Sequence, residues 1–378
     1  MDKLKINIIG SIFGTSGYDN HTRGLINALY KVADVKLSTQ LFPDWEKQCN
    51  DAELDMITKQ GHKENDINII VTTPHNWKLY LGTGINCAYC VWEGSKVPVS
   101  YIDEMLNPKI DLIFVPSEHT KNAIFNTIRC YSNITKENLE DINNLIDNKI
   151  KVIPHGVDLS LFKPKEVKKE QFTFACNKGW RGTTWDRGGV QYLLRAYCEE
   201  FKKEDKVKLI IKLNPAYINP NDIKKSFESL NLPEDRAPIE IIFENTPTNK
   251  LVDFYNKGDV YVCPTRAESF DLGSAEAMAC RLPVIATNYG GQIEHMNNDC
   301  SLFCFFNLEE VKEDIMYEGI EWANISIENL KIHMRWCYEH QDAIKEMGEK
   351  ATKFISDFTW DNSAKLIVEA ICDLKSDK

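Results

Sequence analysis

The chain has 378 residues, of which 43% are hydrophobic and 27% are charged, and its formal net charge at pH 7 is −11. This length predicts two domains, and this composition is typical of a soluble globular protein. The acidic charge argues against nucleic acid as the main partner.

Strand-like and helix-like segments alternate through the first half of the chain. Apolar runs predict strands at residues 5–10, 67–71, 86–91 and 112–115. Apolar residues at helical spacing predict helices at residues 21–30 and 135–148, and a further helix that Ser117 caps. Such alternation predicts a mainly parallel, doubly wound sheet.

The N-terminus and the cysteines indicate the compartment. The chain runs directly into its first strand, so we expect no secretory leader, and no segment approaches the roughly 18 apolar residues of a membrane span. The 12 cysteines are scattered, and the close pair Cys87 and Cys90 lies inside a strand-like run without a second pair. We therefore expect buried free thiols in a reducing cytoplasm.

Charge is distributed unevenly between the two halves. Residues 1–165 hold 18 basic and 20 acidic side chains, and the remainder holds 27 and 36. The less acidic first half is compatible with peripheral contact at the inner face of a membrane, although no basic amphipathic helix is evident there.

The second half of the chain repeats the alternation. Apolar runs predict strands at residues 172–176, 207–211, 239–243, 260–263 and 284–286, with helices between them that include one at 190–201. The stretch 157–169 contains Pro164 and a lysine-rich tail, as a linker would. The predicted domains are residues 1–165 and 166–355, followed by a terminal helix within 356–378.

Two glutamates, Glu268 and Glu276, are the most informative residues. Glu268 follows the predicted strand 260–263, and Glu276 lies about one turn into a predicted helix of small residues at 273–280. The carboxyl end of a parallel strand is where such sheets bind ligands, and a helix N-terminus is a natural seat for phosphate. A carboxylate on each side of that seat can accept hydrogen bonds from sugar hydroxyls.

The run from residue 266 to residue 280 resembles the E-x7-E signature of retaining GT-B glycosyltransferases, the large family numbered four. The resemblance continues through residues 282–291 and also covers residues 152–158 near mid-chain. It implies an α/β fold of the GT-B type, in which two Rossmann-like, doubly wound parallel-sheet domains face an interdomain cleft. It also implies that the terminal helix crosses back to the N-terminal, acceptor-side domain.

The resemblance assigns roles around the two glutamates. It implies that Glu268 faces the donor sugar and that Glu276 holds the ribose of the nucleotide. Asp271 is a departure, because many members have glycine there, and we expect its side chain to narrow the sugar site or to contact the sugar. The remaining residues of the predicted donor site in this run are Phe270, Leu272 and Gly273.

A glycine-containing turn, residues 14–17, follows the first strand. In the family the matching loop lies over the donor phosphates and sugar, which implies donor contacts for Gly17 and Ser16. The turn lacks G-x-G-x-x-G spacing and a suitably placed acid, so a nicotinamide enzyme is not expected.

Cations that serve the leaving group are predicted in the segment 177–189. Family members carry a basic residue after this strand and Lys-Gly just before the helix, which Arg181 and Arg187 match, with Lys178 as a competing candidate. Fixed cations stabilise charge that develops on the diphosphate as the glycosidic bond breaks. They would replace a metal ion, and we expect neither a metal nor another cofactor.

The catalytic residue of the first domain is the least defined. Many members place a histidine beside the reacting carbon, and in this sequence Glu93 occupies the corresponding place. Its carboxylate would steady charge at the anomeric carbon or orient the acceptor hydroxyl; the alternative is a polar residue with no chemical role. We interpret His75 and His119 as satisfied surface or core histidines, and His155 as a structural residue at the domain border.

The expected function is transfer of a sugar from a UDP- or GDP-sugar to a hydroxyl of a lipid-linked glycan, a polysaccharide end or a small molecule. The resemblance implies retention of anomeric configuration. A same-face mechanism is preferred, because no Asp or Glu is placed as a covalent nucleophile. The alternatives are a GT-B-fold isomerase or phosphorylase and a non-catalytic subunit with the same fold.

Overall fold

The computed structural model divides the chain into two compact units. One consists of residues 1–156 and 358–378, and the other of residues 157–357. This division assigns residues 157–165 to the second unit rather than to the first. The structure describes the chain apart from residues 1–3, 39–66, 131–138, 184, 216–217, 313–316, 318 and 377–378.

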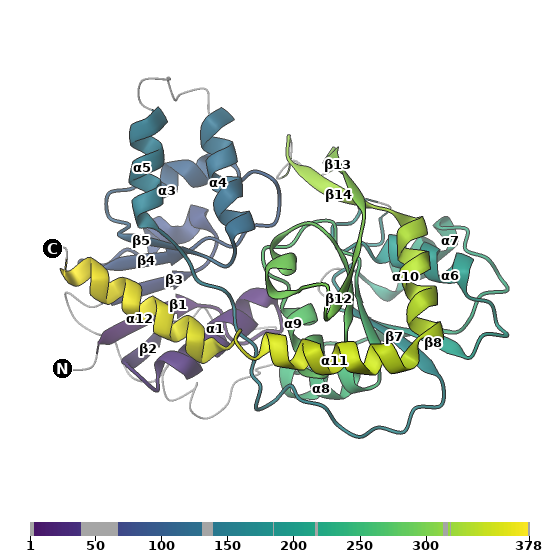
Figure 1. The fold of residues 1–378 in the computed structure, drawn as a ribbon. Helices are drawn as coiled ribbons and strands as arrows, with labels where there is room; N and C mark the ends of the chain where they lie inside the picture. Colours follow the sequence, from purple (N-terminus) through teal and green to yellow (C-terminus); the bar gives the residue numbers. More distant parts are fainter. Residues whose placement is uncertain are drawn as a thin grey trace. The chain divides into compact units, whose positions relative to one another are not determined.

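The first unit is built on a six-stranded parallel sheet with the order β2-β1-β3-β4-β5-β6 (Figure 1). Three predicted strands have the predicted bounds, and β4 is shorter than expected because the chain leaves the sheet after Cys90, whose N–H still bonds the Phe114 carbonyl. The strands are β1 (Lys5–Gly10), β2 (Asp34–Ser38), β3 (Ile67–Val71), β4 (Asn86–Tyr89), β5 (Leu112–Val115) and β6 (Ile150–Val152).

Capping side chains set where two helices of this unit begin. Ser16 accepts a hydrogen bond from the Asp19 N–H in a capping box, so α1 begins four residues before the predicted position 21. Ser117 caps α4 as predicted, accepting from the Thr120 N–H at 3.1 Å. Positions 135–138 of the predicted helix 135–148 lie outside the described residues. The helices are α1 (Gly17–Leu29), η1 (Pro74–Leu79), α3 (Val99–Met105), α4 (Glu118–Cys130), α5 (Leu139–Lys149) and α12 (Trp360–Ser376).

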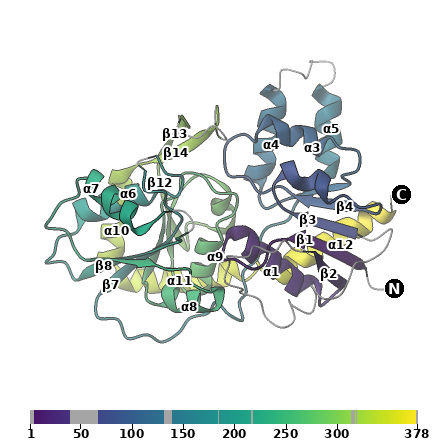
Figure 2. The same ribbon diagram turned by 180° about the vertical axis from the view of Figure 1, so that it is seen from behind.

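The terminal helix α12 completes the core of the first unit. Ile367 and Ile371 are fully buried in the same cluster as Leu25 and Leu29 of α1, and Figures 1 and 2 show α12 beside α1. Gly156 makes this contact possible, because a Cβ there would lie 2.0 Å from the backbone nitrogen of Trp360. The last helix therefore belongs physically to the first unit.

A buried histidine pair lies inside this core. The ring of His21 is 4.2 Å from that of His155 and 4.4 Å from that of Tyr89, and it stacks on Trp360 at 5.6 Å. Burial, followed by the neighbouring His155, lowers the pKa of His21 well below its ordinary value. His21 is therefore neutral in the folded chain across the physiological range.

This neutral histidine predicts a specific acid sensitivity. Below pH about 6.5 the unfolded chain binds a proton at His21 and the folded chain does not. The free energy of unfolding should therefore decrease as the pH is lowered, by up to roughly 1.4 kcal/mol per pH unit. His21→Phe should reduce that slope, as urea unfolding at pH 7 and pH 5 would measure. The matching change at the exposed His75 is the control; equal slopes in wild type and His21→Phe would contradict the prediction.

The second unit contains a six-stranded parallel sheet with the order β12-β11-β10-β7-β8-β9. From β7 the chain moves outward through β8 and β9, and it then returns beside β7 to continue outward through β10, β11 and β12. The point where the direction reverses lies between β7 and β10. The strands are β7 (Phe172–Asn177), β8 (Val207–Leu213), β9 (Ile239–Phe243), β10 (Val260–Cys263), β11 (Val284–Thr287) and β12 (Ser301–Cys304).

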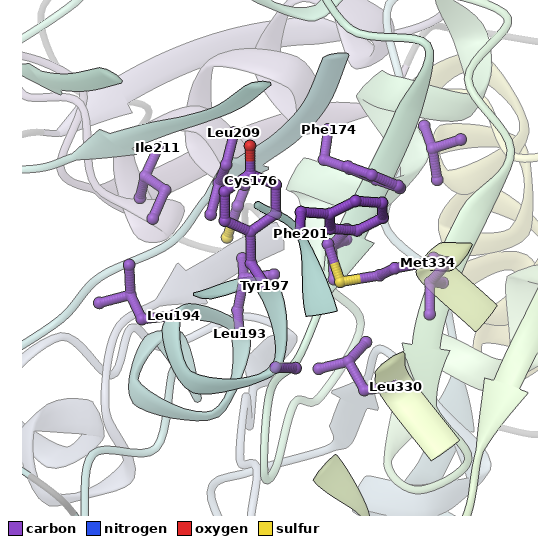
Figure 3. Close-up of a cluster of buried hydrophobic side chains, with 14 of the residues drawn as sticks. Phe174, Cys176, Leu193, Leu194, Tyr197, Phe201, Leu209, Ile211, Leu330 and Met334 are labelled. Carbon is purple, nitrogen blue, oxygen red and sulfur yellow. The ribbon is translucent and has the colours of Figure 1, made fainter. Parts of the chain in front are cut away.

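Aromatic packing joins this sheet to its helices. Figure 3 shows Phe174 of β7 against Tyr197 and Phe201, with Met334 beside them. An antiparallel hairpin of β13 (Phe306–Glu310) and β14 (Glu321–Ile325) was not predicted. The helices are α6 (Val190–Glu200), α7 (Pro220–Ser229), α8 (Thr248–Asn256), α9 (Leu272–Ala279), η2 (Gly291–His295), α10 (Ile327–Glu339) and α11 (Gln341–Ile355).

Candidate active site

Glu268 lies in the loop between β10 and α9, at the carboxyl end of the sheet of the second unit. β10 pairs with β7, and the chain leaves these two strands in opposite directions across the sheet. Ligands of doubly wound sheets bind outside the carboxyl ends of the strands at such a reversal. The topology thus places the predicted sugar-facing glutamate where this fold class binds ligands.

Lys178, which directly follows β7, holds Glu268 from one side. Its ammonium nitrogen lies 3.2 Å from Oε1 of Glu268 and 2.6 Å from Oδ1 of Asp271, and its side chain is only 4% exposed. Burial opposes the charge, but the carboxylates of Asp271 and Glu268 raise the pKa of Lys178 well above its ordinary value. Lys178 is therefore a permanent buried cation.

Arg187 holds Glu268 from the other side. Its Nη1 lies 3.2 Å from Oε2 of Glu268 and donates to the Ala267 carbonyl at 2.7 Å. The structure thus brings two predicted cations, Lys178 and Arg187, to one carboxylate. Arg181 is placed differently: its side chain is exposed, and its backbone N–H donates to Asp186.

The loop before α6 is shaped by Asp186. Its carboxylate accepts from the backbone N–H of Arg181 at 2.7 Å and from that of Gly188 at 2.8 Å. Gly189 adopts φ 73°, and a Cβ there would lie 1.8 Å from the Pro264 carbonyl oxygen. These constraints fix the backbone that carries Arg187 against the end of β10.

Arg266 fastens the segment before Glu268 to the β13–β14 hairpin. Its fully buried guanidinium donates to the Ala323 carbonyl at 2.9 Å and pairs with Glu309 at 3.1 Å. It lies 5.5 Å from the ring of Trp322, and its backbone N–H donates to the Arg187 carbonyl at 2.8 Å. Arg266 therefore links the hairpin with both loops of the candidate site.

Asp271 occupies a backbone conformation that favours glycine, with φ 70°. Its Oδ1 pairs with Lys178, and its Oδ2 accepts from the thiol of Cys263 at 2.9 Å. Burial opposes ionisation, but Lys178 holds the pKa of Asp271 below its ordinary value. The structure places this carboxylate on the buried lysine, beside the predicted sugar site.

The start of α9 is tightly packed on the strand beneath it. A Cβ at Gly273 would lie 2.7 Å from the phenol oxygen of Tyr261. Phe270 is buried against the ring of His295 at 4.5 Å, and burial lowers the pKa of His295 to about 4, so this ring is neutral at pH 7. Phe270 and Leu272 flank the helix start, and its free N–H groups give α9 an anion-favouring end.

Glu276 is buried one turn into α9. Its Oε2 accepts from the phenol of Tyr255 at 2.6 Å, and the Tyr255 oxygen accepts in turn from the Asn177 amide at 3.0 Å. Burial raises the pKa of Glu276 to about 8. The sequence indicated no role for Tyr255, whose apolar helical neighbours in α8 are typical of a core position.

The remaining predicted residues belong to the first unit. Ser16 caps α1, and a Cβ at Gly17 would meet open space. Glu93 is partly buried after β4, and its carbonyl accepts from Nε2 of His119 at 2.9 Å. Burial lowers the pKa of His119, and His75 bonds Ser100 at 2.7 Å.

Comparison with known proteins finds a family that resembles part of the second unit. Residues 179–315 match the family model described as glycosyl transferases group 1. Over these residues the chain is similar to group 1 glycosyltransferases. The matched region contains Arg181, Arg187 and both glutamates, and it begins at the residue after Lys178.

Relatives and solved structures extend the comparison. D-inositol 3-phosphate glycosyltransferase of Segniliparus rotundus is 27% identical over 150 residues, which cover 38% of this chain and 32% of that protein. Two solved structures resemble the chain: a glycosyltransferase of Rickettsia africae (17% identity, TM-score 0.68, 100% of both chains) and an Anabaena protein in complex with UDP-glucose (14% identity, TM-score 0.64, 98% of this chain and 100% of that one). The likeness shows the predicted GT-B fold.

The curated relatives are longer than the matched region. The chain spans 32%, 51%, 49% and 36% of the length of four curated relatives that it matches. Among the described residues, no helix is both long and apolar enough to cross a membrane. In the same part of the chain, no three His, Cys, Asp or Glu side chains gather where they could hold a metal ion.

Proposed function

We propose that the chain transfers a sugar from a nucleotide diphosphate sugar, with UDP or GDP as the nucleotide, to an acceptor hydroxyl. The observation that carries the proposal is Glu268 held between Lys178 and Arg187 at the sheet reversal, beside the N-terminus of α9. The names of the relatives agree with it: one acts on D-inositol 3-phosphate, and a structural neighbour was solved with UDP-glucose.

The site suits departure of a diphosphate. The bond between the anomeric carbon and the phosphate oxygen breaks, and negative charge collects on the diphosphate. Arg187 is the cation better placed to meet it, because its side chain is 32% exposed whereas Lys178 is 4% exposed and already holds two carboxylates. The N-terminus of α9 adds positive potential.

The proposed reaction retains anomeric configuration. The carboxylate of Glu268 faces the sugar and stabilises an oxocarbenium-like transition state. The acceptor oxygen bonds to the anomeric carbon on the face that the phosphate leaves, and the acceptor proton passes to a phosphate oxygen. The acceptor class stays open among a lipid-linked glycan, a polysaccharide end and a small molecule.

Nucleotide binding and donor turnover test the proposal. UDP or GDP at 100 times its dissociation constant should stabilise the folded chain by about 2.7 kcal/mol, which a thermal-shift assay detects. UDP- and GDP-sugars should then release nucleotide slowly without acceptor and faster with it. No shift with either nucleotide would overturn the proposal, binding without turnover would favour the non-catalytic subunit, and product analysis with and without acceptor would reveal an isomerase or phosphorylase.

Transfer is expected to proceed without a divalent metal. Arg187 and the N-terminus of α9 supply the positive charge that a metal would otherwise bring to the leaving group. The measurement is the transfer rate in excess EDTA against the rate with magnesium or manganese. Activity that is lost in EDTA and restored by metal would refute this expectation.

A further inference from the structure

The carboxyl end of β7 contacts both glutamates of the E-x7-E pair through two consecutive residues. Lys178 reaches Glu268 at 3.2 Å. The preceding residue, Asn177, donates its side-chain amide to the phenol oxygen of Tyr255 at 3.0 Å, and that phenol donates to Oε2 of Glu276 at 2.6 Å. One strand end therefore fixes Glu268 directly and Glu276 through Tyr255.

The direction of the hydrogen bonds in this chain is set by chemistry. The amide nitrogen of Asn177 can only donate, so the phenol oxygen of Tyr255 is the acceptor of that bond. The single phenol proton is then committed to Glu276. Tyr255 is fully buried, and the rings of Phe162 and Tyr261, each 5.9 Å away, hold its ring from two sides.

We infer that Tyr255 is a positioning residue for nucleotide binding: it fixes Oε2 of Glu276 so that Oε1 is presented to the ribose hydroxyls. The inference rests on the proposed function, because it needs a nucleotide at Glu276. Tyr255 does not touch the ligand in this arrangement. Its hydrogen bond orients the carboxyl group of Glu276 and favours the ionised form of that group.

The charges around Glu276 give this role a measurable signature. The facing groups are Tyr255 of α8, Lys212 at the end of β8, and Asp271 and Cys280 at the two ends of α9. Burial raises the pKa of Glu276 and Asp271 adds to the rise, whereas the Tyr255 hydrogen bond and Lys212 oppose it. Burial also keeps the thiol of Cys280 protonated, with its pKa raised to about 12.

Nucleotide affinity should therefore depend on pH. An ionised carboxylate accepts hydrogen bonds at both oxygens, so ribose binding should strengthen as the pH rises through the pKa of Glu276, which lies at about 8. Tyr255→Phe removes a group that lowers this pKa. The midpoint of the affinity curve should then move to higher pH, which a loss of packing alone would not cause.

The experiment is calorimetric titration of the full chain with UDP and with GDP between pH 7 and pH 9.5. Tyr255→Phe should weaken binding about fivefold at pH 7.5, as expected for one hydrogen bond, and should shift the midpoint upward. Tyr197→Phe is the matched control, because Tyr197 is equally buried in the same unit, but its phenol donates to the Pro238 carbonyl at 3.0 Å instead. Its midpoint should stay at the wild-type value.

The outcomes separate the inference from the proposed function. If the wild-type chain binds neither nucleotide, the proposed function fails. If the wild-type chain binds nucleotide, two results would show that the positioning role is wrong. In one, Tyr255→Phe keeps the wild-type affinity and midpoint. In the other, both phenylalanine variants weaken binding equally and neither midpoint moves. Asn177→Ala removes the donor that strengthens the Tyr255 phenol as a donor to Glu276. It should shift the midpoint in the same direction by a smaller amount, and it serves if Tyr255→Phe does not fold.

Discussion

Glu268→Gln is expected to lower kcat roughly a hundredfold, whereas Glu276→Gln is expected mainly to raise KM. The charge of Glu268 lies where positive charge develops at the anomeric carbon, so its loss costs more in the transition state than in the ground state. Glu276 is assigned to the ribose, far from the breaking bond, and its loss removes binding that both states share. Glutamine keeps the shape of the glutamate side chain and removes its charge, so each variant measures the effect of the charge alone.

The two variants also differ in their dependence on pH. Because burial raises the pKa of Glu276 to about 8, glutamine imitates its protonated form, and the KM defect should be larger at pH 9 than at pH 7. Kinetics at saturating acceptor, with thermal unfolding as a check on folding, measure both effects. Changes in KM alone for both variants would mean that the roles are wrongly assigned, and wild-type kinetics for both would remove the glycosyltransferase proposal.

Arg187→Ala is expected to weaken UDP or GDP binding tenfold or more. A charged hydrogen bond to a diphosphate contributes roughly 1.5–3 kcal/mol, and each 1.4 kcal/mol changes the dissociation constant tenfold. Arg195→Ala, at an exposed position of the neighbouring helix α6, is the control for loss of one positive charge. Calorimetry would measure all variants at one salt concentration.

The same titrations test which cations serve the diphosphate. The sequence favoured Arg181 and Arg187, with Lys178 as the competitor of Arg187. The structure brings Lys178 and Arg187 to Glu268, each at 3.2 Å, while the side chain of Arg181 is exposed. Arg181→Ala should therefore behave like Arg195→Ala. A tenfold loss of nucleotide affinity in Arg181→Ala would support the pair of arginines that the sequence favoured. An unchanged nucleotide affinity in a folded Arg187→Ala would remove Arg187 from the site.

The elements that the sequence predicted share one physical property. Strands such as β5 and β10 are buried on both faces, so every residue in them is apolar and the run is visible. β2 contains Asp34 and Lys36 at the sheet edge, and the β13–β14 hairpin is rich in acidic residues, so neither produced such a run. Partners across the sheet, rather than local hydrophobicity, stabilise these strands.

The residues of the site also fall into two groups, those that local sequence could locate and those that only the fold brings together. Glu268 and Glu276 could be located because their spacing and their flanking strands are local in the sequence. Tyr255 lies 21 residues before Glu276 and Lys178 lies 90 residues before Glu268, and only the folded sheet brings these partners together. Which of several basic residues in the 177–189 loop turns inward depends on the turn that Asp186 holds, and composition does not encode that choice.

The contribution of α12 to the first core has a consequence for biosynthesis. Ile367 and Ile371 fill the core that Leu25 and Leu29 begin, so the unit that is translated first lacks an essential part of its interior until residues 360–376 have left the ribosome. The second unit is contiguous, from residue 157 to residue 357, and all of its strands emerge earlier. Domains usually complete folding in the order of their synthesis, and we expect this chain to reverse that order.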